Sequence, residues 1–127
     1  MPLFIFYRVL DIEKKNSKEA YKLLPHPTFI YTVKFHPESL DILCTGGYDK
    51  VIRVWSINNK RKKSSKYGEL LQEIFSHSGY INSICFAHDG LTFYSADSAG
   101  IIKSWNCFNT ENFNLNHKGL YLKYLSL

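Results

Sequence analysis

The sequence is poor in cysteine and lacks any long apolar run. Its three cysteines, Cys44, Cys85 and Cys107, form no C-x-x-C pair and are odd in number. These spacings argue against a disulfide framework or a zinc site and favour buried free thiols, with no bound metal. The apolar start, Met1 to Leu10, is too short to span a bilayer, and neither a basic leader region nor a small-residue cleavage site accompanies it. We therefore expect a cytoplasmic protein, or a piece of one, without a transmembrane segment.

Positive charge is concentrated in one short segment. The chain carries 16 basic and 11 acidic residues, a net charge of +5. Without the five basic residues of positions 60–66, 11 basic residues balance 11 acidic ones, so a nucleic acid is not the expected partner of the whole domain. The insert 58–68 is a solvated loop, a nuclear-localisation patch, or a contact for phosphate or an anionic membrane surface. Its basic residues are Lys60, Arg61, Lys62, Lys63 and Lys66.

The chain contains an internal repeat of about 50 residues. Residues 26–35, HPTFIYTVKF, align with residues 77–86, HSGYINSICF, at an offset of 51. Residues 51–55, VIRVW, align with residues 101–105, IIKSW, at an offset of 50. The spacing from His to Trp is thus 29 residues in one copy and 28 in the other, which predicts two equivalent structural units.

Each copy has the pattern of short strands separated by turn residues, in a chain whose 45% hydrophobic and 16% aromatic content suits a folded protein. Residues 3–12 and 18–24 resemble the last two strands of a preceding unit, with Tyr7 at the position of the tryptophan. Residues 120–127 are apolar enough for a strand, but the sequence suggests no partner for it. The strands expected in the two copies are 29–36, 41–45, 50–56 and 69–75, then 80–86, 91–95 and 100–106.

These motifs resemble those of the WD40 family of β-propellers. The likeness is good over residues 24–106 and loose over residues 3–23, and it rests on His26, Thr45-Gly46-Gly47-Tyr48-Asp49, Ile52-Arg53-Val54-Trp55, His77, Ser95-Ala96-Asp97-Ser98 and Ile102-Lys103-Ser104-Trp105. It implies an all-β fold with about two four-stranded antiparallel blades and part of a preceding one. The expected division is 1–24 for the end of a preceding blade, 25–75 and 76–107 for two repeats, and 108–127 for an unassigned tail.

The resemblance also implies a hydrogen-bonded tetrad of His, Ser or Thr, Asp and Trp in each repeat. In the first repeat these residues are His26, Thr45, Asp49 and Trp55. In the second repeat His77, Ser95 and Trp105 match, but Ala99 stands where the Asp is expected. Asp97 is the candidate substitute, so we expect the second tetrad to be incomplete. The family's Trp-Asp dipeptide is also degenerate, since Ser56 and Asn106 follow the two tryptophans.

The polar residues of the repeat do not indicate an enzyme. His26, Thr45 and Asp49 have the composition of a hydrolytic triad, but the hydroxyl lies in a strand and the set recurs in the next repeat. Duplication favours a structural role, so we expect no catalytic residue, no cofactor and no small-molecule substrate. His36 and His88 precede turn residues and are expected to be exposed.

The WD40 resemblance implies a non-catalytic scaffold that binds other proteins, and within the family the likeness is to a scaffold of the ciliary transition zone. The expected location is therefore cytoplasmic, at the basal body or the transition zone of the cilium. Loops on a rigid frame often carry recognition, so the candidate protein contacts are Phe29, Tyr48, Lys50 and Tyr80, with packing between blades as an equal alternative for Phe29 and Tyr80. The alternative function is RNA or phosphoprotein binding through the basic insert.

The number of repeats is too small for a closed ring. A propeller needs about 4–8 blades, and each blade depends on its neighbours for burial. We therefore expect the remaining blades of a larger propeller around this chain, or else assembly of several copies. The isolated 127-residue chain is expected to be poorly soluble or oligomeric because its apolar blade faces are open to water.

Overall fold

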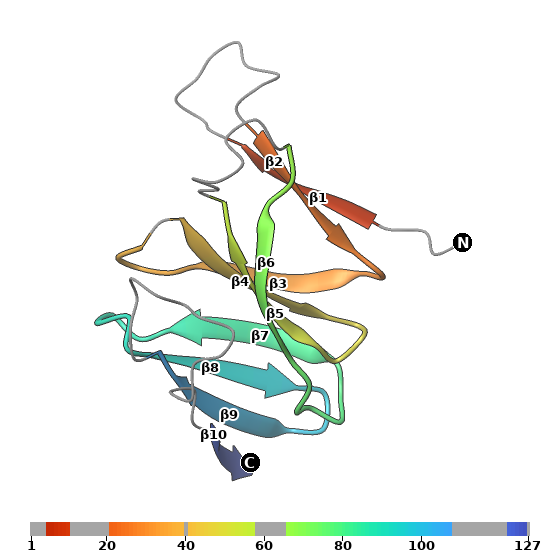
Figure 1. Ribbon diagram of the computed structural model, residues 1–127. Helices are drawn as coiled ribbons and strands as arrows, with labels where there is room; N and C mark the ends of the chain where they lie inside the picture. Colours follow the sequence, from red (N-terminus) through yellow and green to blue (C-terminus); the bar gives the residue numbers. More distant parts are fainter. Residues whose placement is uncertain (1–4, 11–20, 40, 58–65, 108–121, 127) are drawn as a thin grey trace.

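The computed structural model describes residues 5–10, 21–39, 41–57, 66–107 and 122–126. Within these residues the chain forms ten strands in three antiparallel sheets (Figure 1), and no helix is present there. The sheets follow one another along the molecule in sequence order. The all-β class and the two four-stranded antiparallel sheets predicted from the repeat are therefore confirmed. None of the described residues belongs to a helix that could cross a membrane.

The first sheet has two strands, β1 (Ile5–Leu10) and β2 (Tyr21–His26), which pair from Ile5 with His26 to Leu10 with Tyr21. The sequence predicted the second of these strands to stop at Leu24, but it continues through Pro25. The backbone N–H of Leu23 points away from β1 and donates to the carbonyl oxygen of Lys66, and position 25 faces the same side, so the missing N–H of this proline removes no bond between β1 and β2.

The second sheet has the strand order β3 (Ile30–Phe35), β4 (Ile42–Gly47), β5 (Ile52–Ser56) and β6 (Glu69–Ile74). Strand β4 runs two residues beyond its predicted end at Thr45, because Gly46 and Gly47 pair with Thr32 and Ile30 of β3. A Cβ on Gly46 would lie 2.4 Å from Cγ2 of Ile81, and one on Gly47 would lie 2.1 Å from the carbonyl oxygen of Phe29. These glycines therefore permit close packing of strands as well as the turn that follows.

The third sheet repeats this order with β7 (Ile81–Phe86), β8 (Thr92–Asp97), β9 (Ile101–Asn106) and β10 (Leu122–Ser126). Strand β10 comes from the tail for which the sequence suggested no partner. It pairs antiparallel with β9, from Leu122 with Trp105 to Ser126 with Ile101. The tail thus supplies the fourth strand that the second repeat lacked.

Two apolar clusters hold the sheets together, and the second sheet contributes to both. One cluster joins it to the first sheet through Leu24, Leu43 and Trp55. The other joins it to the third sheet through ten buried residues, which are Ile42, Cys44, Ile52, Val54, Ile74, Ile81, Ile84, Phe93, Trp105 and Cys107. Side chains of a strand alternate between its two faces. Burial on both faces therefore explains why every residue of β4 is buried.

The cysteines are free thiols, but they are not all buried. Burial raises the pKa of the Cys44 thiol well above its ordinary value and raises that of Cys107 to about 12. Cys85 is exposed, so the prediction of burial was wrong for this residue. It lies on β7 between Ile84 and Phe86, which pack toward the second sheet, and its side chain points to the opposite face.

Candidate functional site

The second histidine network is complete. His77 Nδ1 lies 2.7 Å from Asp97 Oδ2 and donates to it, because a carboxylate oxygen can only accept there. His77 Nε2 then accepts from the hydroxyl of Ser95 at 2.6 Å, and the indole N–H of Trp105 donates to the same hydroxyl at 3.0 Å. All four groups are thus satisfied in a buried site, and the prediction of an incomplete second tetrad was wrong.

The charge state of this network follows from its surroundings. Burial lowers the pKa of His77 and outweighs the hydrogen bond to Asp97, which raises it. Burial alone would raise the pKa of Asp97, but the hydrogen bonds from His77 and from the backbone N–H groups of Ile101 and Ala99 outweigh it and lower that pKa. The network therefore pairs a neutral imidazole with a carboxylate.

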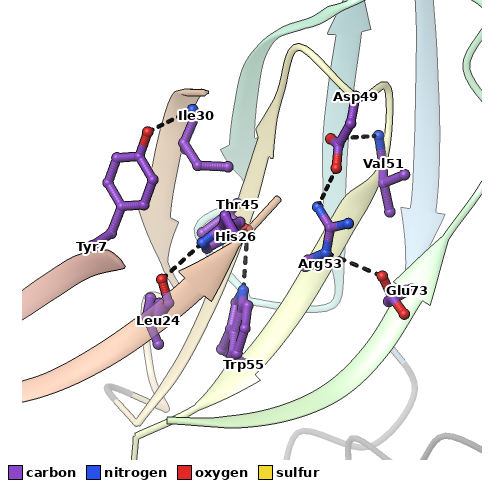
Figure 2. A network of polar contacts seen from close by, with 10 residues as sticks. All are labelled: Tyr7, Leu24, His26, Ile30, Thr45, Asp49, Val51, Arg53, Trp55 and Glu73. Carbon is purple, nitrogen blue, oxygen red and sulfur yellow. Dashed lines mark hydrogen bonds and ion pairs between the residues drawn. The ribbon is translucent and has the colours of Figure 1, made fainter. Parts of the chain in front are cut away.

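The first network differs from the second in how its histidine is held (Figure 2). The hydroxyl of Thr45 donates to His26 Nε2 at 2.9 Å and accepts from the indole N–H of Trp55 at 3.0 Å. His26 Nδ1 donates to the carbonyl oxygen of Leu24 at 3.0 Å. Burial is the main cause of the lowered pKa of His26, and the contact with Leu24 only partly offsets it. This histidine is therefore also neutral.

Asp49 does not take part in the first network, in contrast to the prediction. Its Oδ2 lies 2.7 Å from Nη1 of Arg53, whose Nε also donates to Glu73 Oε2 at 3.1 Å (Figure 2). The Arg53 side chain is almost fully buried, so its guanidinium requires carboxylate partners. Lys103 stands at the corresponding position of the third sheet and donates to the carbonyl oxygen of Ser76 instead.

Strand register explains why the two networks use different acceptors. Gly47 pairs with Ile30 in the second sheet, and Asp97 pairs with Ile81 in the third. The two residues therefore occupy the same position relative to the turn that follows. The first repeat therefore has a glycine at the position from which Asp97 reaches its histidine. Leu24 supplies the acceptor through its backbone.

Each network joins neighbouring parts of the sheet stack. His26 is the last residue of β2 in the first sheet, while Thr45 and Trp55 lie on β4 and β5 in the second. His77 lies between β6 and β7, and its partners Ser95 and Trp105 belong to the third sheet. The two hydroxyls are buried and already hydrogen-bonded, so the arrangement stabilises the sheets and presents no nucleophile to solvent.

His36 is a third buried histidine, and its predicted exposure was wrong. Its Nδ1 accepts from the backbone N–H groups of Ser39 at 2.9 Å and Glu38 at 3.2 Å, and its Nε2 donates to the carbonyl oxygen of Gly90 at 2.9 Å. It thus connects the loop after β3 to the turn between β7 and β8. No local sequence pattern predicts this contact, because the partner is a backbone carbonyl 54 residues away. His88 is exposed, as predicted.

The predicted protein contacts lie on turns at one end of the sheets. The rings of Tyr48 and Tyr80 stack with centroids 4.9 Å apart and an interplanar angle of 16°. The N–H of Tyr48 donates to the carbonyl oxygen of Phe29 at 3.0 Å, and Lys50 closes the turn that contains Tyr48. We call Phe29, Tyr48, Lys50 and Tyr80 together the aromatic rim. Phe75, which is 74% exposed in the loop after β6, was missed because it continues the apolar pattern of that strand.

Repeat equivalence separates the roles of the rim residues. Phe29 and Tyr80 correspond at the offset of 51, and Tyr80 packs on Tyr48 of the preceding sheet. Packing between sheets is therefore part of the role of Tyr80, as the sequence allowed. Phe29 is 62% exposed and has no such partner among the residues that the structure describes.

The basic insert is only partly described. Lys60, Arg61, Lys62 and Lys63 lie outside the described residues. Lys66 is exposed, with its ammonium 5.4 Å from the ring centroid of Tyr67, and its carbonyl oxygen accepts from the N–H of Leu23 at 2.7 Å. The end of the insert is thus fixed against β2. Across the described part of the chain, no group of three or more His, Cys, Asp or Glu side chains is placed to hold a metal ion.

Comparisons with known proteins agree on the repeat. The model of the WD domain, G-beta repeat family matches residues 17–56 and 68–106. Each match begins before the last strand of one sheet, β2 or β6, which we call its outer strand. It ends with the third strand of the next sheet, β5 or β9. The repeat in the sequence is therefore shifted by one strand relative to the sheets.

Relatives and solved structures cover most of this chain. Mouse jouberin is 38% identical over 97 residues, which are 76% of this chain and 9% of that protein. RACK1 of Caenorhabditis elegans, a small ribosomal subunit protein, is 30% identical over 64% of this chain and 23% of that one. A chain of the polycomb repressive complex 2 of Chaetomium thermophilum has a TM-score of 0.59 at 21% identity and covers 72% of this chain and 19% of that one. The likeness to that structure shows the fold, and this chain spans less than a tenth of the length of jouberin.

Proposed function

Because the chain belongs to the WD40 family of WD-domain, G-beta repeats, we propose that it is a non-catalytic scaffold that binds other proteins through the aromatic rim. The observation that carries this proposal is the stacked pair of Tyr48 and Tyr80, which are 48% and 40% exposed on turns fixed by backbone hydrogen bonds. Rigid aromatic side chains on such turns are favoured at the centres of protein interfaces.

The absence of catalysis is part of this proposal. The hydroxyls of Thr45 and Ser95 are buried and already bonded to an imidazole and an indole. Burial keeps both imidazoles neutral, and the arrangement occurs twice in one chain. These features support a structural role for both networks.

We further propose that the first sheet is the outer half of a blade and that more strands of a larger propeller cover the second sheet. Val33 and Ile84 pair with the equivalent residues Thr45 and Ser95, so they occupy the same position in successive sheets. Ile84 is fully buried by the second sheet, whereas Val33 is 43% exposed. An inner pair of strands beside β1 would bury Val33 in the same way.

The finer proposal is a role in assembly of the cilium, at the basal body or the transition zone. It is supported by the 38% identity to mouse jouberin, which is the ciliary transition-zone scaffold whose likeness the sequence motifs indicated. Expression of the tagged chain in ciliated cells tests it. We expect the tag to overlap a basal-body marker, and a uniform cytoplasmic distribution would contradict the location while leaving the scaffold role intact.

The rim is tested by selecting binders from a displayed peptide library with the immobilised chain. We expect the selected peptides to lose binding to the double variant Tyr48→Ser/Tyr80→Ser. The matched control is Tyr94→Ser, because Tyr94 is equally exposed, at 40%, but lies on β8 away from the turns. Failure to enrich any peptide, or equal binding to wild type and double variant, would contradict the proposal.

A further inference from the structure

One turn of the aromatic rim has a backbone conformation that its residue does not favour. Lys50 has a φ of 70°, and the corresponding residue of the third sheet, Gly100, has a φ of 82°. Both values lie in the left-handed region, where glycine is unstrained and lysine is not. The turns are otherwise alike, because Lys50 N donates to the carbonyl oxygen of Gly47 and Gly100 N to that of Asp97, each at 3.2 Å. Glycine at position 50 would therefore form the same turn with less strain.

The side chain of Lys50 contributes little to the fold. It is exposed, and it forms no ion pair with any residue that the structure describes. A Cβ built on the equivalent Gly100 meets no atom within 4 Å, so this position points into open space. A strained residue whose side chain has no role in packing suggests a role in binding.

Lys50 supplies the exposed charge of the two turns. Both turns also carry a carboxylate, but each is used internally. Asp49 pairs with Arg53, and Asp97 is buried against His77. Among the described residues of the turns 47–50 and 97–100, the charge open to solvent is therefore positive, and it attracts an anionic group of a partner.

Tyr48 and Tyr80 place an apolar surface next to this charge. Tyr48 lies two residues before Lys50 in the same turn, and its ring stacks on Tyr80 from the neighbouring sheet. The loop of Tyr80 is fixed in turn by Ser98, whose hydroxyl accepts from the N–H of Tyr80 at 2.9 Å and whose own N–H donates to the Tyr80 carbonyl oxygen at 2.9 Å. A preformed pair of rings binds an apolar side chain without further ordering.

We propose that Tyr48, Lys50 and Tyr80 bind a protein segment in which a carboxylate side chain stands beside an aromatic or aliphatic one. The carboxylate pairs with Nζ of Lys50, and the apolar side chain covers the exposed parts of the two rings. This inference rests on the proposed function of the rim and adds the chemistry of its partner.

The test uses the full chain and a short fluorescein-labelled peptide with a phenylalanine between two glutamates, titrated by fluorescence anisotropy. Lys50→Gly is expected to weaken binding about two- to fivefold, the range for an exposed ion pair. Its thermal midpoint should stay the same or rise, because the strain of the turn is relieved. The matched control is Lys34→Ser, which removes an exposed lysine from β3 and should leave the affinity unchanged.

Two further reagents decide between the possible outcomes. Equal binding of a peptide with lysines in place of the glutamates, tighter binding of an oligothymidine, or an unchanged affinity of Lys50→Gly would overturn the inference. If in these cases Tyr48→Ser/Tyr80→Ser still abolishes binding of a peptide, the rim remains a protein site and only the partner chemistry is wrong. If the double variant binds all peptides like the wild type, the proposed function fails as well.

Discussion

The two aspartates of the repeats provide a direct test of the polar networks, because family resemblance and structure assign them opposite roles. By resemblance Asp49 belongs to a tetrad and Asp97 is only a substitute. In the structure Asp97 accepts from His77 at 2.7 Å and from the N–H groups of Ala99 and Ile101 at 2.9 and 3.1 Å, and its side chain is fully buried. Asp97→Asn should therefore be the more harmful change.

The magnitudes follow from the bonds that are lost. Asparagine at position 97 keeps an oxygen for the backbone N–H groups but loses the charged bond to His77, which is worth about 1.5–3 kcal/mol. Asp49→Asn removes one of two carboxylates from Arg53 and leaves Glu73 in place, so we expect a loss of about 1 kcal/mol. Both variants remove one negative charge, which makes them a matched pair.

Urea unfolding followed by tryptophan fluorescence measures both losses. The two tryptophans of the chain, Trp55 and Trp105, donate to the two networks and so report on them directly. With a slope of about 2 kcal/mol/M, Asp97→Asn should lower the midpoint by about 1 M. An equal or larger effect of Asp49→Asn would refute the assignment of the acceptors.

Three other predictions concern the histidines, a glycine and the isolated chain. Stability should fall as the pH drops below 6.5, because the lowered pKa values of His26 and His77 mean that the unfolded chain takes up protons first; a urea midpoint that rises on acidification would contradict this. Gly90→Ala should lower the free energy of unfolding by about 1–3 kcal/mol, because position 90 has a φ of 71° and the added Cβ would lie 2.5 Å from Cε1 of His36. Gly100→Ala places its Cβ in open space and should lower it by about 1 kcal/mol. Calorimetry should rank the two variants in this order. The isolated chain should elute as oligomers in size-exclusion chromatography because apolar sheet faces are exposed, and a monomer that melts cooperatively would show this reasoning to be wrong.

The repeat made most of the fold predictable. Alternating β-branched and aromatic residues between turn residues placed seven of the eight strands of the two four-stranded sheets to within two residues. The same comparison brought His, hydroxyl and Trp together in each repeat, because a buried imidazole and indole both need hydrogen-bond partners. These features depend on local pattern and spacing, which a single sequence contains.

The errors arose where a contact depends on strand register or on distant backbone. Asp97 was predicted only as a substitute, because the family motif places the aspartate later in the turn, at position 99. The register of β8 instead brings the earlier residue Asp97 to His77. His36 was expected at the surface because its partner, the carbonyl of Gly90, lies in the next sheet. Strand β10 pairs across residues 108–121, for which the sequence has no repeat to compare.

The one-strand shift between repeat and sheet has a consequence for how the number of repeats in such a protein can change. A copy that starts with the outer strand of one sheet and ends with the third strand of the next cannot be removed without breaking the sheets on both sides and rejoining them. When a whole copy is gained or lost, however, the flanking last strand pairs with an equivalent third strand, so each sheet keeps its full set of strands. Blade number can therefore change in single steps, while a cut at a sheet boundary separates strands that belong together.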